Sequence, residues 1–87
     1  MNQPKTRDAG PGTLLDLPAG TWGEVGSLSG DEEICAKLAE IGFTPGEWVH
    51  VNAVLPLGGA VAIDLRGTSF ALRRDEAACV RVREVTP

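Results

Sequence analysis

The chain lacks most of the side chains that an active site would need. Its 87 residues include one His, two Cys and no Tyr. An enzyme needs a positioned nucleophile or an acid–base pair. The carboxylates of Asp31, Glu32 and Glu33 fall at a predicted helix start, where interaction with the helix dipole explains them. We therefore expect that this protein is not an enzyme.

Long apolar segments are also missing. No apolar run approaches the roughly 18 residues that a transmembrane helix requires. The first five residues, MNQPK, contain no apolar stretch of the kind found in signal peptides. The sequence therefore predicts a cytoplasmic protein that does not span a membrane, with a length suited to one small domain.

Positive charge is scarce, with 8 Lys and Arg against 12 Asp and Glu and a net charge of −4. Phosphate recognition needs a local surplus of basic side chains, so the balance argues against nucleic acid as a partner. The main basic cluster comprises Arg73, Arg74, Arg81 and Arg83. Arg81 and Arg83 alternate with valines, which predicts a solvent-facing strand surface. The alternative is contact with an acidic protein or with acidic lipid headgroups.

The two cysteines, Cys35 and Cys79, match no CxxC spacing. We expect them to act as small buried or half-buried hydrophobic residues and not as a disulfide. They give little support for a metal site.

The chain is expected to divide into a tail and one domain. Residues 1–12 are polar, rich in Pro and Gly and without periodicity, which predicts a disordered N-terminal tail. Residues 13–87 form the predicted domain, entered through a segment anchored by Leu14 and Leu17.

One short helix is predicted to end at Ile41. Ile34, Leu38 and Ile41 recur at helical spacing. Ser29 and Glu32 have the spacing of a capping box, which indicates the start of this helix.

The segment 38–46, LAEIGFTPG, predicts a tight corner after that helix. Gly42 follows the last periodic residue, where a left-handed residue commonly ends a helix. Pro45 and Gly46 then occupy the central positions of a predicted type II turn.

Five short strands are expected around this corner. They cover residues 21–28, 48–54, 61–65, a segment containing Phe70 and Leu72, and 80–85, with one helical turn over 74–78. Gly23 and Gly26 predict a bulge or a sharp bend in the first strand, and Gly58-Gly59 marks a hairpin. The sequence thus predicts a mainly β fold: a small, five-stranded, partly open barrel with one short helix between strands 1 and 2.

These residues together resemble the FeoA family. The resemblance rests on Leu14, Leu17, Gly20, Val25 and Leu28, on the 38–46 segment, on Val49-His50-Val51, on the Pro56 to Gly59 loop, and on the residues spaced from Val61 to Val82. It implies an SH3-like barrel and a small cytosolic accessory protein that regulates the ferrous iron permease FeoB.

The resemblance also leaves an alternative function. The same module forms the C-terminal domain of iron-dependent repressors, which implies a metal- or peptide-binding regulatory module. No winged-helix segment precedes the domain in these 87 residues, so we expect the stand-alone accessory form. Whether it activates or inhibits transport, and whether it forms a homodimer, stays open.

The predicted partner-binding residues are Leu55, Leu57, Trp48 and Phe43. Leu57 lies in a Gly-rich loop and has two interpretations: a lid over the open end of the barrel, or part of an apolar patch with Trp48 or with the corner at residues 41–43. In the second interpretation a permease segment covers the patch. Trp22 is expected to cap the core, and Trp48 either caps it or makes a contact.

His50 is the candidate metal ligand. It lies on the strand face opposite Val49 and Val51, and we expect it to be exposed. No His-x-His or Glu-x-x-His spacing accompanies it, so no cofactor is expected to be required. Weak or intermolecular binding of Fe(II) or Zn(II), with a carboxylate from a neighbouring molecule, is the metal hypothesis that the sequence supports.

Overall fold

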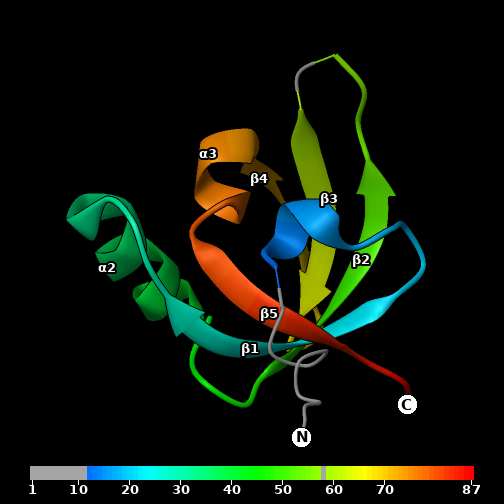
Figure 1. The fold of residues 1–87 in the computed structure, drawn as a ribbon, viewed down its shortest axis with the longest axis horizontal. Helices are drawn as coiled ribbons and strands as arrows, with labels where there is room; N and C mark the ends of the chain where they lie inside the picture. The colour runs from blue at the N-terminus through cyan, green and yellow to red at the C-terminus, as the bar shows by residue number, and fades with distance from the viewer. Residues whose placement is uncertain (1–11, 58) are drawn as a thin grey trace, which may run out of the picture.

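A single antiparallel sheet forms the body of the computed structural model, which describes residues 12–57 and 59–87 (Figure 1). Its strands are β1 (Trp22–Leu28), β2 (Trp48–Val54), β3 (Ala60–Leu65), β4 (Thr68–Arg73) and β5 (Val80–Val85). They lie in the order β4-β3-β2-β1-β5. The predicted mainly β fold with five strands is therefore confirmed. The predicted disordered tail lies, up to residue 11, outside the described residues.

Three short helical segments connect or precede these strands. They are η1 (Leu14–Asp16), α2 (Glu32–Ile41) between β1 and β2, and α3 (Arg74–Ala77) between β4 and β5. The one short helix predicted between the first two strands is α2. Within the described residues no helix is long and apolar enough to cross a bilayer.

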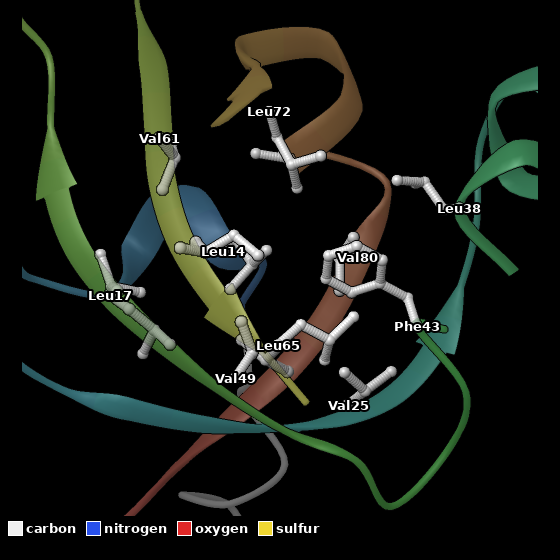
Figure 2. Close-up of a cluster of buried hydrophobic side chains, with 14 of the residues drawn as sticks. Leu14, Leu17, Val25, Leu38, Phe43, Val49, Val61, Leu65, Leu72 and Val80 are labelled. Atoms are coloured by element: carbon white, nitrogen blue, oxygen red, sulfur yellow. The ribbon is translucent and has the colours of Figure 1, made fainter. Parts of the chain in front are cut away.

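The core lies on the concave side of the curved sheet. Alternating residues of the strands point into it, joined by side chains from η1, α2 and α3 (Figure 2). Leu14, Val25, Leu38, Phe43 and Ile63 are among its fully buried members. Leu14 and Leu17 anchor the entry segment in this core, as predicted from the sequence.

The predicted bulge in the first strand is confirmed. The pairing of β1 with β5 shifts register between Val25 and Ser27, so Gly26 is the extra residue. A second shift, which the sequence did not predict, lies between Val51 and Ala53 in β2. Bulges of this kind bend strands, which a five-stranded sheet needs in order to enclose a core.

The helix start differs from the prediction. Asp31 caps α2, and its side chain accepts the Ile34 N–H at 3.0 Å. The predicted capping box of Ser29 and Glu32 is wrong, because Asp31 is the cap, and Ser29, which directly follows β1, donates its N–H to the carbonyl of Cys79 at 2.9 Å.

The corner after α2 follows the prediction. Gly42 has φ of 128° and donates its N–H to the Leu38 carbonyl at 3.1 Å. The Glu47 N–H bonds to the Thr44 carbonyl at 3.1 Å, with Gly46 at φ of 92°, as a type II turn requires. The corner directs Phe43 into the core.

Candidate functional site

Three ring side chains gather on the outer face of β1 and β2. Trp22 lies opposite His50 in the strand register, and their ring centroids are 4.8 Å apart with an edge-on geometry. The rings of Trp22 and Trp48 are 6.1 Å apart. We call Trp22, Trp48 and His50 the aromatic face. The prediction that Trp22 caps the core is wrong, because Trp22 alternates with the buried Gly23 and Val25 and so points outward.

A chain of hydrogen bonds continues from this face across the sheet. The Nδ1 of His50 lies 2.6 Å from Oδ1 of Asn52, and Nδ2 of Asn52 donates to Oδ1 of Asp64 at 2.9 Å. The Ser69 hydroxyl donates to the same carboxylate oxygen. These bonds from Ser69, and then from Asn52, lower the pKa of Asp64.

This series of hydrogen bonds determines the tautomer of His50. An ionised carboxylate only accepts hydrogen bonds, so the Asn52 amide must present its NH₂ group to Asp64. Its carbonyl oxygen then faces Nδ1 of His50, which must carry the proton. In the neutral ring the lone pair is left on Nε2, the arrangement found in metal-binding histidines. His50 is half-buried and not fully exposed as predicted.

The residues around His50 do not complete a metal site. No group of three His, Cys, Asp or Glu side chains comes together among residues 12–57 and 59–87. Asp64 faces His50 in register, but its carboxylate already accepts hydrogen bonds from Asn52 and Ser69. A structural zinc site takes four ligands, and catalytic sites take three from the protein. The described residues therefore offer a single metal ligand here, the Nε2 of His50, whose lone pair is free in the Nδ1–H tautomer.

A second exposed apolar surface lies at the end of the β2–β3 hairpin. Leu57 is fully exposed at 103%, and Val54 and Leu55 are about half exposed, at 48% and 47%. We call these three residues the hairpin tip. No charged residue occurs between Glu47 and Asp64. The exposure of Leu57 rules out the lid interpretation in this conformation, since a lid would bury its side chain.

A groove lies beside the base of this hairpin. It has a volume of about 660 Å³, and its lining combines apolar residues, among them Leu15 and Ala60, with the charged residues Arg73, Arg74 and Asp75. The predicted cluster of four arginines is therefore divided, because Arg81 lies with Arg83 on β5. No pattern in the sequence indicates this groove, because it forms only when η1 packs beside α3.

The structure separates the predicted partner-binding residues. Phe43 is 0% exposed and belongs to the core, so it offers no contact surface in this conformation. Trp48, 39% exposed, begins β2, whereas Leu55 and Leu57 follow the end of this seven-residue strand, about 20 Å away. The corner at Gly42 lies against Leu65, at the far end of β3 from the hairpin tip. The expected single patch is therefore two surfaces, the aromatic face and the hairpin tip.

The chain matches a known family over most of its length. The FeoA domain matches residues 12–84. No curated protein matches the sequence.

Solved structures agree with this match. FeoA of Stenotrophomonas maltophilia, an SH3 domain protein crystallised with zinc, is 38% identical over 80% of this chain and 87% of its own, with a TM-score of 0.70. An iron uptake regulatory protein (FeoA) is 30% identical over 84% of this chain and 96% of its own, with a TM-score of 0.75. A manganese-dependent transcriptional repressor shares the fold at 20% identity and a TM-score of 0.76, over 84% of this chain and 41% of its own.

Proposed function

The chain belongs to the FeoA family, whose members are linked to ferrous iron transport, and from this premise we propose that it is a non-catalytic accessory protein of iron uptake. In this proposal it docks on the cytosolic region of an FeoB-type permease and regulates it. A protein without catalytic groups must act through its surface, and two apolar surfaces are available to it.

The exposure of Leu57 is the observation that carries this proposal. A Leu side chain that none of the described residues covers gains about 1.5–3 kcal/mol when a partner buries it. Val54 and Leu55 add apolar area beside it. Exposed apolar side chains that lie together in this way mark a surface suited to contact with another protein.

The groove next to the hairpin indicates the chemistry of the segment that would dock. Its apolar lining at Leu15 and Ala60 suits aliphatic side chains. Arg73 is already paired with Asp75 at 3.4 Å, so Arg74 is the basic residue of the lining that suits a carboxylate of the partner. We therefore expect a permease segment that combines an apolar anchor with acidic residues.

Substitution of Leu57 tests the proposal. Leu57→Ser should leave the melting temperature unchanged, because the side chain is exposed, and should abolish capture of the permease from a detergent extract. Ile41→Ser is the matched control, since Ile41 is an exposed aliphatic residue at the end of α2. Full capture by Leu57→Ser, or equal loss with Ile41→Ser, would contradict docking through the hairpin tip.

A second candidate function is that of a metal-responsive regulatory module. The prepared Nε2 of His50 supports it, as do the zinc bound by the relative from Stenotrophomonas maltophilia and the fold shared with a manganese-dependent repressor. One ligand per molecule suits a metal that bridges two molecules, through His50 of one and a carboxylate of another.

Calorimetric titration separates the two candidates. We expect the protein to fold without metal and to bind Zn(II) or Fe(II) weakly. Submicromolar binding that is lost in His50→Ala would favour the metal-responsive module. Light scattering with and without Zn(II) would show whether binding forms a dimer.

A further inference from the structure

The fold brings the two cysteines to one place. Cys79 lies directly before β5, and its Sγ is 2.9 Å from the point where a Cβ on Gly30 would be. Gly30 immediately precedes Asp31, the residue that caps α2. The Cys79 thiol therefore lies against the beginning of this helix, and only a glycine at position 30 leaves it room.

Cys35 approaches the same point from inside the helix. Its N–H donates to the Asp31 carbonyl at 2.9 Å, so it lies one turn above the cap. Side chains of a helix lean toward its N-terminus, which directs the Cys35 thiol back toward the first turn and its cap, Asp31. Cys35 packs against the core cluster that contains Cys79, and the nearby Cys79 thiol helps to raise the pKa of Cys35 after burial itself. Figure 2 shows Leu38 of α2 and Val80 of β5, which belong to the same cluster.

We propose that Cys35 and Cys79 are a redox modification site that closes to a reversible disulfide under oxidising conditions. Both are free thiols in the structure. Disulfides of proteins in reducing compartments are usually transient or regulatory, which suits a pair that the fold brings together without joining.

The chemistry balances with a low-molecular-weight disulfide, such as oxidised glutathione, as the oxidant. The Cys35 thiolate attacks one sulfur of that disulfide, whose S–S bond breaks and releases one glutathione thiolate. The Cys79 thiolate then attacks Sγ of Cys35, which forms the protein disulfide and releases the second glutathione thiolate. The protein loses two electrons and two protons, and one glutathione disulfide becomes two thiols.

The two cysteines differ in access, which assigns their roles. Cys35 is half-buried and can meet the oxidant, whereas Cys79 is 6% exposed and donates its S–H to the Asp75 carbonyl at 3.4 Å. Cys35 is therefore the attacking thiol and Cys79 the resolving one. Burial, together with Cys79 and nearby carboxylates, raises the pKa of Cys35. A raised pKa lowers the thiolate fraction of Cys35 and so slows the first attack.

The disulfide would fasten α2 to the start of β5. The ion pair between Lys37 and Glu76 already joins α2 to α3 next to this point, at 2.9 Å. A covalent link here encloses most of the sheet in one loop and restricts the unfolded chain, so oxidation should raise the thermal midpoint.

Mass spectrometry after treatment of the full chain with oxidised glutathione tests the proposal. The monomer should become lighter by two hydrogen atoms, lose both alkylatable thiols and yield a digest peptide pair that joins Cys35 to Cys79. Its thermal midpoint should rise by several degrees and return after reduction. This readout uses the unaltered chain and needs no variant to fold.

Cys35→Ser is the control, because its side chain is half-buried and the change removes only the attacking thiol. It should show neither the linked peptides nor the rise in thermal midpoint. The proposal is overturned if the unaltered chain keeps two alkylatable thiols, carries two glutathione adducts, or forms only disulfides between molecules.

Discussion

The Nζ of Lys37 on α2 lies 2.9 Å from Oε2 of Glu76 on α3. The other carboxylate oxygen of Glu76 accepts the backbone N–H of Arg73 at 2.8 Å. Glu76 is buried, with 6% of its surface exposed. Its carboxylate contacts the Lys37 ammonium, the backbone N–H of Arg73 and, at 3.9 Å, the Arg73 guanidinium, and these contacts compensate for its burial. A single carboxylate therefore joins both helices to the end of β4.

Glu76 should make stability depend on pH. The hydrogen bond from Arg73, and then Lys37, hold the pKa of Glu76 below its usual range. Because the pKa is lower in the folded than in the unfolded state, this stabilisation is present above the unfolded value and is lost as the pH falls through the folded one. Glu76→Gln should cost about 1–2 kcal/mol at neutral pH and progressively less in acid. Urea unfolding between about pH 7 and pH 3 measures the difference, and an equal cost at every pH would contradict the electrostatic role.

Gly42→Val should destabilise the corner after α2. The residue has φ of 128° and ψ of 9°, a conformation that β-branched residues avoid. A Cβ there would lie 3.4 Å from Cδ of Arg66, so the cost comes from the backbone more than from a clash. We expect a loss of more than about 1 kcal/mol in urea unfolding. A melting temperature equal to that of the unaltered protein would show that the helix end is placed incorrectly.

Both tryptophans should be accessible to a quencher. Trp22 and Trp48 share the outer face of the sheet and are half-buried and 39% exposed, respectively. Iodide should quench each of the single variants, Trp22→Phe and Trp48→Phe. If the Trp48→Phe variant instead showed blue-shifted emission that iodide does not quench, Trp22 would be buried in the core and the outward orientation would be wrong.

The tautomer of His50 should depend on Asp64. In the unaltered protein, nitrogen-detected NMR of the neutral ring should show the proton on Nδ1, because Asn52 presents its carbonyl oxygen to it. Asp64→Asn removes the group that only accepts, so the Asn52 amide can turn and the Nε2–H tautomer should gain population. An unchanged tautomer in Asp64→Asn would show that the hydrogen bonds through Asn52 to Asp64 do not orient the ring. Ser69→Ala, which leaves the Asp64 carboxylate in place, is the control.

Local patterns were sufficient for the elements and their order. The spacing of Ile34 and Leu38, the stop at Gly42 and the Pro45-Gly46 turn each depend on neighbouring residues, so the sequence alone could indicate them. The helix start was misassigned because a distant contact decides it: Ser29 bonds to Cys79 across the sheet.

The candidate site depended more on long-range geometry. The sequence left two interpretations of Leu57 open, and exposure was one of them. The burial of Phe43 depends on the direction in which the corner turns the chain, which the structure shows. Strand pairing places Trp22 beside His50, and no spacing in the sequence shows this pairing. The meeting of Cys35 with Cys79 likewise comes from the way in which α2 and β5 pack.

The contact between the segment that enters the domain and its last strand has a consequence for engineering. Thr13 bridges Arg81, and the Gly12 carbonyl accepts the Val82 N–H at 3.0 Å, so the entry to the domain lies against its last strand, five residues before residue 87. Domains with adjacent ends tolerate circular permutation and insertion into other chains. In a circular permutant, a linker would join residue 87 to residue 12, and the new termini would lie in the Arg66-Gly67 turn. The hairpin tip would remain intact in such a permutant, and the domain could be inserted as a cassette into a host protein through that turn.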